Sequence, residues 1–477
     1  MKPFKYIFLT LLFVFISCKN DTKIISDLQE IHSEIKKEFA PDKRVELFDI
    51  QFSISNNQIV LEGETTSKKA FSILLDSLNN RKIEFINKIR VLPDTAVGNQ
   101  QFAVARNSVI NIRSKPKHSA ELGTQGLLGM SLKVLDKKGD FYRIQTPDKY
   151  ISWVDKGGIT RMDKQNFTSW NASEKVIFTE VFGYVYSHKT EKSAIISDIT
   201  LGGILKFLSE ENGFYKVEYP DKRIGFIKKN KAEIYKNWLQ ELNPSAENVE
   251  NIAKKMDGFP YLWGGTSAKG IDCSGYTKMV YLMNGFIIPR DASQQINAGK
   301  KVDKNLDFSD LQKGDLLFFG TKATAEKKQR VVHVGIWLGN DKMEFIHASG
   351  NVHLSSMDKN QPNYDEFNKN RYLGSKRYLG VEDDKIINLI ENEYLRYQNA
   401  ELSLFYNDFK KEIIKTTWSD EPPGKLSGVF FRISKNKYFE IELDSIPKLY
   451  RMNLELNWEI NKVGNSKIRK IKLVEKY

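Results

Sequence analysis

The sequence predicts a multidomain α+β protein in which two small β-barrels precede a larger domain and an α+β module lies at each end. Three observations support this prediction: the chain length, an internal repeat, and a glycine-rich loop that leads into a helix and is followed by two strands. The chain has 477 residues, of which 40% are hydrophobic and 28% charged. It can therefore form roughly three to five domains, each with its own core.

The first residues have the order of an export signal. A basic start, Met1 to Lys5, is followed by an apolar run from Tyr6 to Ile16 that is too short for an ordinary membrane-spanning helix. Cys18, directly after Phe15-Ile16-Ser17, resembles the lipobox of bacterial lipoproteins. The resemblance implies a lipoprotein signal peptide over 1–18, a lipidated Cys18, and an exported protein anchored to the envelope at the outer membrane or periplasmic face. A plain secretory signal with an incidental cysteine is the alternative.

Residues 19–100 are predicted to form a small α+β module. Helical spacing over 24–39 ends at Ala40-Pro41, and a second helical pattern covers 68–78. Strand patterns cover 45–53, 59–63 and 83–92. The sequence of this module contains no ionisable cluster that suggests catalysis, so its role stays open.

An internal repeat with a fixed offset of 73 residues predicts the two barrels. Leu128-Gly129 recurs as Leu201-Gly202, and Pro147-Asp148-Lys149 recurs as Pro220-Asp221-Lys222. Each copy consists of short alternating strands separated by turn residues, which is typical of a small β-barrel. The two copies are expected at about 102–162 and 174–235.

Both copies resemble bacterial SH3-like domains. Asn111-Ile-Arg-Ser-Lys-Pro116 and Ser152-Trp153-Val154 carry the resemblance in the first copy, and Gly225-Phe226-Ile227 stands at the matching place in the second. The resemblance implies a general surface for attachment to the cell wall. One barrel could instead lie against the following domain and narrow its cleft, and the sequence leaves these two roles open.

The third unit is expected over 243–380, and its central feature is Cys273. A glycine-rich loop precedes this cysteine, and the apolar residues after it recur at helical spacing, so Cys273 is predicted at a helix start. Unpaired N–H groups and the positive end of the helix dipole stabilise an anion there, which predicts a thiolate. If Cys18 carries lipid, no disulfide is possible and Cys273 is a lone thiol in an exported protein.

Two histidines supply the candidate base. Strand patterns at 333–337 and 344–347 flank the turn Gly339-Asn-Asp341, and a hairpin of this kind would bring His347 beside His333. One ring would take the thiol proton and the other would hold the first ring in position. Two histidines and one cysteine without grouped carboxylates make a poor zinc site, so we expect no metal.

Six sequence blocks in this unit resemble the NlpC-type family of papain-like cysteine peptidases, which cut bacterial cell-wall peptides. They occur in the family's order and comprise Tyr261-x-Trp-Gly-Gly, Asp272-Cys-Ser-Gly275, Pro289-Arg-Asp291, Leu311-x-x-Gly-Asp-Leu-x-x-Phe319, His333-Val-Gly-Ile-Trp337 and Ile346-His-Ala348. The resemblance implies a papain-like catalytic domain with Cys273 as nucleophile, His333 as base and His347 as the orienting residue. It further implies no cofactor, and it places Tyr261 near the oxyanion site.

The order of two SH3-like barrels before this domain is similar to the dipeptidyl-peptidase VI branch of the family. That branch hydrolyses the γ-D-glutamyl bond to L-lysine or meso-diaminopimelate in stem peptides with a free N-terminal L-alanine, and releases L-Ala-γ-D-Glu. The resemblance implies that Asp291 and Tyr261 hold the alanine ammonium. It also implies that Asp272 and Ser274 line the glutamate side, and that the first barrel contributes an acidic residue. The residues that match these roles on the barrel are Glu121 and, as a second candidate, Tyr150. Ala292 replaces the family's usual serine, which puts one substrate hydrogen bond in doubt.

Three other functions stay open at this point. An endopeptidase could act on intact peptidoglycan, a non-catalytic scaffold could bind the wall, and an acyltransferase could use the same fold. The net charge of +13 comes from lysines that are spread along the chain with acids among them, so we expect no nucleic-acid partner. The expected partners are stem peptides and a membrane, the latter through the lipid anchor, and the protein is expected to be a monomer.

Residues 381–477 lie outside the resemblance and are predicted to form an α+β extension of unknown role. One or two helices are expected over 386–414, with Tyr394, Leu395, Phe405 and Phe409 facing inward. Strands are expected over 426–433, 438–443, 454–460 and 468–474.

Overall fold

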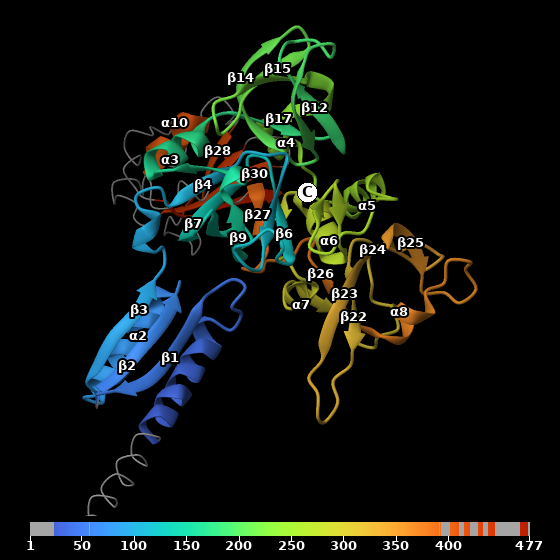
Figure 1. The fold of residues 1–477 in the computed structure, drawn as a ribbon. Helices are drawn as coiled ribbons and strands as arrows, with labels where there is room; N and C mark the ends of the chain where they lie inside the picture. Colours follow the sequence, from blue (N-terminus) through green and yellow to red (C-terminus); the bar gives the residue numbers. More distant parts are fainter. Residues whose placement is uncertain are drawn as a thin grey trace, which may run out of the picture.

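A computed structural model describes residues 23–56, 58–390, 392, 401–409, 415–419, 428–432, 437–443 and 468–475. The predicted signal peptide, including Cys18, lies outside these residues. The N-terminal module lies at one end of the molecule and the second barrel at the other, with the first barrel and the third domain between them (Figure 1). The predicted multidomain α+β class, with SH3-like barrels ahead of a larger domain, is confirmed.

The N-terminal module is a three-stranded sheet covered by two helices. A helix over 23–39 precedes β1 (Phe48–Ser55), β2 (Gln58–Thr65), α2 (Lys68–Asn80) and β3 (Phe85–Val91). The first hairpin is antiparallel, and α2 connects β2 to the parallel strand β3. The first strand begins at Phe48, not at Val45 as expected, because residues 40–47 form a loop that contacts other domains.

Ion pairs hold the N-terminal module on the first barrel. Arg90 donates to Asp136 at 2.9 Å and to Glu64 at 2.6 Å, and Glu64 also pairs with Arg143 of the barrel. The backbone N–H of Asp94 donates to the carbonyl of Leu135 at 2.8 Å. The module is thus fixed to the barrel by both side-chain and backbone contacts.

The two barrels have the same strand order. The first comprises β4 (Phe102–Ala105), β5 (Val109–Arg113), β6 (Leu122–Leu127), β7 (Ser131–Lys138), β8 (Phe141–Gln145), β9 (Ile151–Asp155) and β10 (Ile159–Met162). The second comprises β11 (Lys175–Phe178), β12 (Phe182–Tyr186), β13 (Ile195–Thr200), β14 (Ile204–Glu211), β15 (Phe214–Glu218), β16 (Ile224–Lys228) and β17 (Ala232–Ile234). The sheet order β10-β4-β7-β8-β9-β5-β6 is repeated as β17-β11-β14-β15-β16-β12-β13, so the 73-residue sequence repeat is a repeat of topology.

The barrels contact each other at a repeated glycine turn. Gly129 has φ +82°, and a Cβ atom there would lie 2.1 Å from the carbonyl oxygen of Ile204. The backbone N–H of Ile204 donates to the carbonyl of Leu128 at 2.8 Å. Only glycine combines this positive φ with so close an approach of the second barrel. The helix α3 (Lys164–Ala172) connects the two barrels.

The third domain combines helices with a six-stranded antiparallel sheet. The helices are α4 (Tyr235–Glu241), α5 (Ala246–Lys255), α6 (Cys273–Leu282), α7 (Ala292–Gln295) and α8 (Glu366–Asn370). The sheet order is β21 (Lys300–Val302), β26 (Tyr372–Arg377), β22 (Leu316–Thr321), β23 (Arg330–Trp337), β24 (Glu344–Ser349) and β25 (Asn351–Ser356). Short ribbons β18 (Thr266–Ser267) and β19 (Gly270–Ile271) precede α6. The buried helix α6 contacts β23 and β24.

The C-terminal extension packs against the start of the third domain. Its strand β27 (Ile387–Asn388) pairs with β20 (Phe286–Ile287), and Phe405 and Phe409 on α10 (Leu402–Phe409) are buried in one apolar cluster with Trp238. A four-stranded antiparallel sheet follows in the order β28 (Lys415–Ser419), β29 (Gly428–Arg432), β30 (Lys437–Leu443) and β31 (Ile468–Glu475). The sequence did not predict β28. The predicted strand at 454–460 and the residues Tyr394 and Leu395 lie outside the described residues.

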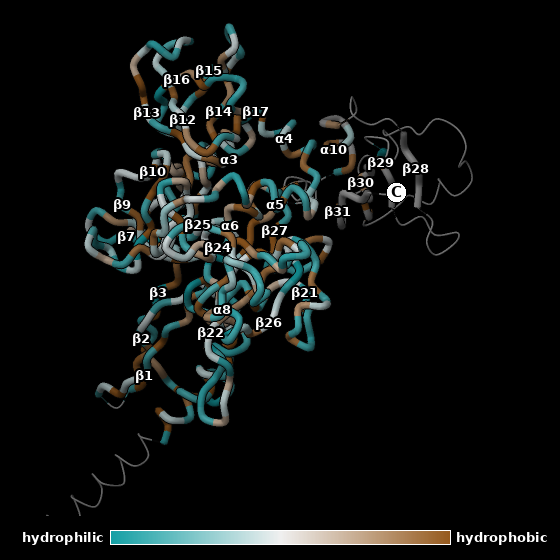
Figure 2. The backbone as a smooth tube through the Cα atoms, turned by 90° about the vertical axis from the view of Figure 1, so that its right-hand side faces the viewer, coloured by the Kyte–Doolittle hydropathy of each residue, from teal (hydrophilic) through white to brown (hydrophobic). Residues whose placement is uncertain are grey.

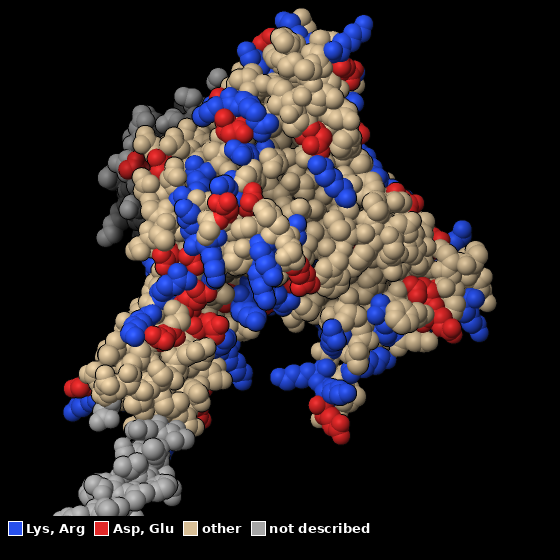
Figure 3. Space-filling view, viewed as in Figure 1, with Lys and Arg blue, Asp and Glu red and all other residues tan. Residues whose placement is uncertain are grey.

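Hydropathy and charge follow the domain structure. Apolar segments (brown in Figure 2) lie in the strands of each barrel and in α6, so each unit has a core of its own. On the face shown in Figure 3, Lys and Arg are spread over several elements with Asp and Glu among them. None of the helices in the described part of the chain is both long enough and apolar enough to span a bilayer.

Candidate active site

Cys273 is the first residue of α6. Asp272 is the N-cap of this helix, and its carboxylate accepts the N–H of Gly275 at 2.7 Å. A helix start leaves its first N–H groups without intrahelical partners, so the N–H of Cys273 is available to an oxygen that gains negative charge near the sulfur. The loop and helix pattern in the sequence therefore predicted the position of the thiol correctly.

Burial dominates the electrostatics of the thiol. The Cys273 side chain is only 6% exposed, and burial, together with the Asp272 charge, raises its pKa to about 12. The backbone N–H groups of Val334 and Ser274 and the Arg290 guanidinium lower the pKa, but to a smaller extent. In the free protein the group is therefore a thiol. The expectation of a thiolate is wrong for this state, because desolvation of the anion outweighs the stabilisation at the helix start.

His333 and His347 form the predicted pair. They lie on the neighbouring strands β23 and β24, and His333 Nε2 is 2.6 Å from His347 Nδ1. His347 Nε2 in turn is 3.1 Å from the hydroxyl of Ser355. These contacts engage Nε2 of His333, and the backbone N–H of the next residue, Val334, bonds to the Cys273 sulfur, so the histidine pair is on the strand that adjoins the thiol. Gly335 belongs to β23, and a Cβ atom there would lie 2.8 Å from Phe345 and 3.2 Å from His347.

Both imidazoles are neutral in the free protein. Burial lowers the pKa of His333 to about 3, and the charge of Arg371 acts in the same direction. Burial also lowers the pKa of His347 well below its ordinary value. A neutral His333 can accept a proton, so it has the protonation state that a general base requires.

Tyr261 and Arg371 complete the surroundings of the thiol. The pKa of Tyr261 is raised mainly by burial, and the nearby Cys273 and Asp272 act in the same direction. The Tyr261 hydroxyl therefore stays a donor. The Tyr261 N–H donates to the carbonyl of Gly350 at 2.9 Å, which fixes the residue beside the β24–β25 hairpin. Arg371, which follows α8, acts on both Cys273 and His333. The sequence blocks included Tyr261 but gave no reason to single out Arg371.

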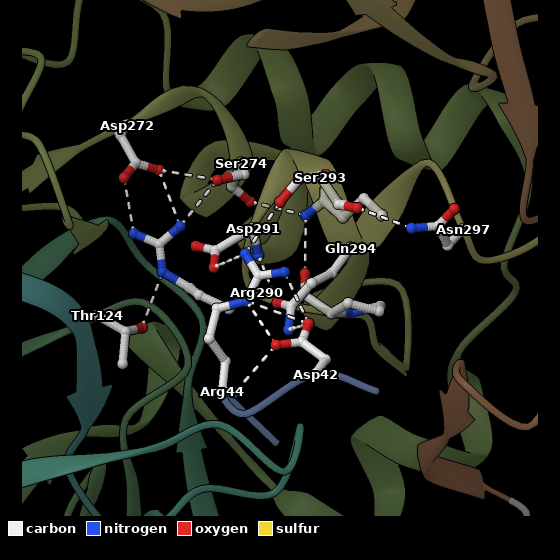
Figure 4. Close-up of polar contacts among 12 residues, drawn as sticks. Asp42, Arg44, Thr124, Asp272, Ser274, Arg290, Asp291, Ser293, Gln294 and Asn297 are labelled. Atoms are coloured by element: carbon white, nitrogen blue, oxygen red, sulfur yellow. Dashed lines mark hydrogen bonds and ion pairs between the residues drawn. The ribbon is translucent and has the colours of Figure 1, made fainter. Parts of the chain in front are cut away.

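Asp272 has a structural role that the sequence did not predict. Its two oxygens accept from Arg290 at 3.0 and 2.7 Å (Figure 4). They also accept from the Gly264 N–H at 2.9 Å and from the Gly275 N–H. These contacts position α6 and the loop before it, and the predicted substrate contact of Asp272 stays a prediction. Arg290 also donates to Ser274 Oγ at 2.9 Å, and the predicted substrate contact of Ser274 stays a prediction.

The first barrel lies against the catalytic domain. Gln125 accepts from the Thr266 N–H at 3.0 Å and from the Ser267 hydroxyl at 2.9 Å, and Arg290 donates to Thr124 Oγ1 at 2.9 Å. Lys278 of α6 pairs with Asp148 of the barrel at 2.6 Å. Of the two roles left open for the barrels, the structure thus shows the contact with the catalytic domain for the first barrel.

The two barrel residues predicted at the site lie in different surroundings. Glu121 is exposed and accepts from Trp263 Nε1 at 2.8 Å, so it lies beside the Tyr261 loop. Tyr150 is half-buried, and burial and the nearby Asp291 charge raise its pKa to about 12. Tyr150 is therefore the barrel residue that the structure brings together with Asp291.

Asp291 has a partner that the sequence did not predict. Arg44, from the loop over 40–47 of the N-terminal module, donates to Asp291 Oδ2 at 2.8 Å and to Ser293 Oγ at 2.9 Å (Figure 4). Burial raises the pKa of the Asp291 carboxyl, while Arg290 and Arg44 act in the opposite direction. No sequence signal marks this pair, because the two residues are 247 positions apart.

In the part of the chain that the structure describes, no set of side chains is suited to bind a metal ion. No group of three or more His, Cys, Asp or Glu side chains there is arranged to hold an ion. A free thiol at a helix start, a neutral histidine pair and donors for an oxyanion instead define a hydrolase of the cysteine type.

Comparisons with known proteins agree with this class. Residues 258–371 match the NlpC/P60 family and residues 108–160 match the bacterial SH3 domain. The gamma-D-glutamyl-L-lysine dipeptidyl-peptidase of Bacillus cereus is 33% identical over 270 residues, which cover 54% of this chain and 76% of that protein. The dipeptidyl-peptidase 6 of Lysinibacillus sphaericus is 28% identical over 272 residues, or 55% of this chain and 94% of that protein. The chain belongs to the NlpC/P60 family.

Among solved structures, an NlpC/P60 family protein from Bacillus cereus is similar with 28% identity and a TM-score of 0.49, covering 58% of this chain and 99% of that one. The match to the NlpC/P60 family confirms the prediction made from the six sequence blocks. The protein is a cysteine peptidase that hydrolyses cell-wall peptides.

Proposed function

We propose that the protein is a dipeptidyl-peptidase that hydrolyses the γ-D-glutamyl bond to L-lysine or meso-diaminopimelate in stem peptides with a free N-terminal L-alanine. The observation that carries the proposal is the position of Tyr150 and Asp291 at the junction of the first barrel and the catalytic domain. A carboxylate at this junction can bind a terminal ammonium at a fixed distance from the thiol. The Bacillus cereus and Bacillus subtilis relatives named gamma-D-glutamyl-L-lysine dipeptidyl-peptidases support the same substrate class.

The reaction begins with the neutral Cys273 and His333 pair. His333 Nδ1 takes the Sγ proton while the sulfur attacks the γ-carbonyl carbon, and the oxyanion is stabilised by the N–H of Cys273 and the Tyr261 hydroxyl. The imidazolium then donates its proton to the leaving amine of the diamino acid, and the C–N bond breaks. His333 next deprotonates a water molecule, which hydrolyses the thioester and releases L-Ala-γ-D-Glu with Cys273 again a thiol.

One assay tests the substrate and the amine requirement together. Purified protein is incubated with L-Ala-γ-D-Glu-L-Lys and with its N-acetylated form, and the products are quantified by mass spectrometry. We expect cleavage of the free peptide and little cleavage of the acetylated one, because a neutral amide cannot make the charge-assisted hydrogen bond to the Asp291 carboxylate that a terminal ammonium makes. Equal cleavage of both would favour an endopeptidase that acts on longer wall peptides.

The inactive-scaffold alternative predicts a different result. Cys273→Ala removes the nucleophile, so the proposal requires that it abolish cleavage while the protein stays folded. Full biological activity of this variant would support a wall-binding scaffold. Transfer of the dipeptide to an added amine in place of water would support an acyltransferase.

The proposal includes export and attachment to the envelope through lipid on Cys18. It is supported by the basic start, the apolar run and the cysteine at positions 1–18. Metabolic labelling with a radioactive fatty acid should mark the wild-type protein and not Cys18→Ser. Release of both forms as unlabelled soluble protein would leave a plain secretory signal as the explanation.

A further inference from the structure

The N-terminal module reaches the catalytic domain through one loop. Residues 40–47 connect its first helix to β1, and the loop carries Arg44 to the start of α7. In Figure 4 the Arg44 side chain points at the Asp291 carboxylate from the opposite side to Arg290. The two distances, 2.8 Å to Asp291 Oδ2 and 2.9 Å to Ser293 Oγ, are those of charge-assisted hydrogen bonds.

Arg44 is held in this position from two sides. Asp42 accepts from its Nε at 2.8 Å and from its Nη2 at 2.7 Å, and Gln294 of α7 donates to Asp42 at 2.8 Å. The Arg44 carbonyl accepts the N–H of Ile151, the first residue of strand β9 in the barrel, at 2.6 Å. The guanidinium is therefore held by Asp42 of the same loop, and Asp42 and the Arg44 backbone are fixed by residues of other domains, so the contact is built into the domain arrangement.

The position of Arg44 has a chemical consequence for the substrate. Under the proposed function Asp291 pairs with the terminal ammonium, but a guanidinium already occupies one of its oxygens. The Arg44 side chain is 35% exposed and the Asp291 side chain 26%, so solvent can assist an exchange of one cation for the other. Both ligands are cations and both need the same carboxylate, so they compete.

We propose that Arg44 is a tethered cation in the ammonium position, and that the N-terminal module thereby sets the affinity of the enzyme for the free amino terminus of its substrate. This inference rests on the proposed function. Productive binding requires the substrate ammonium to displace Arg44 from Asp291. Since Arg44 is tethered, its effective concentration at the carboxylate is high, and it weakens binding of the free amine without touching the thiol or the histidines.

The test uses the full chain and two substitutions in the same loop. Arg44→Met removes the guanidinium but keeps an aliphatic side chain, and Lys43→Met removes one positive charge at the exposed neighbouring position. With L-Ala-γ-D-Glu-L-Lys we expect a KM about tenfold lower for Arg44→Met and an unchanged kcat, because hydrogen bonds to charged groups are worth a factor of about ten or more. Lys43→Met should resemble the wild type, and residual cleavage of the N-acetylated peptide should not respond to Arg44→Met.

A second variant, Asp42→Asn, tests the inference if Arg44→Met does not fold. Asp42→Asn keeps Arg44 but weakens its anchor, so KM should fall in the same direction by a smaller factor. An unchanged or higher KM in the folded variants, with the tripeptide still cleaved, overturns the inference and leaves the proposed function standing. If wild type and variants all leave the tripeptide uncut, the proposed function fails and the inference fails with it. Equal cleavage of the free and acetylated peptides by the wild type would show that the terminal ammonium is not recognised, so the proposed function and the inference would both fail.

Discussion

The reactive thiol shows how strongly burial decides chemistry at the scale of one residue. Cys273 lies at a helix start, where the dipole favours an anion, yet its pKa is raised to about 12 because the side chain is almost fully desolvated. His333, with a pKa lowered to about 3, stays neutral over the physiological range. The free enzyme is therefore a neutral pair, and charge separates only when a substrate is attacked.

The neutral state of Cys273 and His333 predicts how the alkylation rate of Cys273 depends on pH. In a Cys18→Ser background Cys273 is the remaining cysteine of the two in the sequence. Below a raised pKa the thiolate fraction grows tenfold with each pH unit, so the iodoacetamide rate should rise about tenfold per unit between pH 6 and 9. Labelling kinetics followed by mass spectrometry measure this rate. A flat rate between pH 5 and 8 would mean that a thiolate and imidazolium already exist in the free enzyme.

His347 should act on the reaction through His333. His347→Ala removes the partner of His333 Nε2, and we expect kcat to fall roughly 100-fold, within the usual range for general acid–base catalysis, with little change in KM. His347→Asn restores a polar partner and should recover part of this loss. His353→Ala is the matched control, since its ring lies against that of His347 at a tilt of 58° but its Nδ1 bonds only to the Asn351 carbonyl among the contacts described. A kcat loss in His353→Ala as large as in His347→Ala would contradict the assignment.

At the scale of elements, α6 is fixed by a buried ion pair at its first turn. Arg290 is 1% exposed and its guanidinium reaches Asp272, Ser274 and Thr124, which belong to the helix and the first barrel. Burial of both charges costs desolvation, so the pair is tolerated because nearly every donor and acceptor is satisfied. The thiol is thus positioned by a network that the sequence blocks marked but did not explain.

Asp272→Asn separates the charge of this residue from its capping role. Asparagine is also a good N-cap, so α6 keeps its cap while Arg290 loses a buried counter-charge. We expect the free energy of unfolding to fall by about 3–5 kcal/mol in urea denaturation. Asp341→Asn, on the exposed turn between β23 and β24, should have a free energy of unfolding close to that of the wild type. A loss below about 1 kcal/mol in Asp272→Asn would show that the pair is not needed to hold the helix.

Local patterns were sufficient for much of the fold. Helical spacing located α6, the turn at Gly339 located the histidine hairpin, and the 73-residue repeat located strands that share one order in both barrels. The strand β28 was missed because Lys415–Ser419 has no apolar alternation and follows the helical pattern expected up to residue 414 without a turn residue between them. Contacts between distant segments left no signal either, and Arg44 with Asp291 is the clearest case.

At the scale of the whole molecule, the first barrel is part of the active-site structure. Thr124 bonds to Arg290, Gln125 bonds to Thr266, and Lys278 of α6 pairs with Asp148. The same barrel holds the N-terminal module, which carries Arg44 to Asp291. Three domains therefore meet at the amine end of the proposed substrate site, and the barrel connects the other two.

The Asp148–Lys278 pair predicts that the first barrel and the catalytic domain unfold together. The Asp148 side chain is 2% exposed and that of Lys278 is 11%, so Asp148→Asn leaves a nearly buried ammonium without its counter-charge. We expect the free energy of unfolding to fall by about 3–5 kcal/mol, with the far-UV dichroism transition and the urea dependence of Cys273 labelling shifting to the same lower midpoint. Asp140→Asn, which removes one partner of an exposed barrel pair with Lys156, should leave both midpoints in place. Because Cys273 lies in α6 and not in the barrel, a shift in dichroism with unchanged protection of the thiol would show that the two domains are stabilised independently.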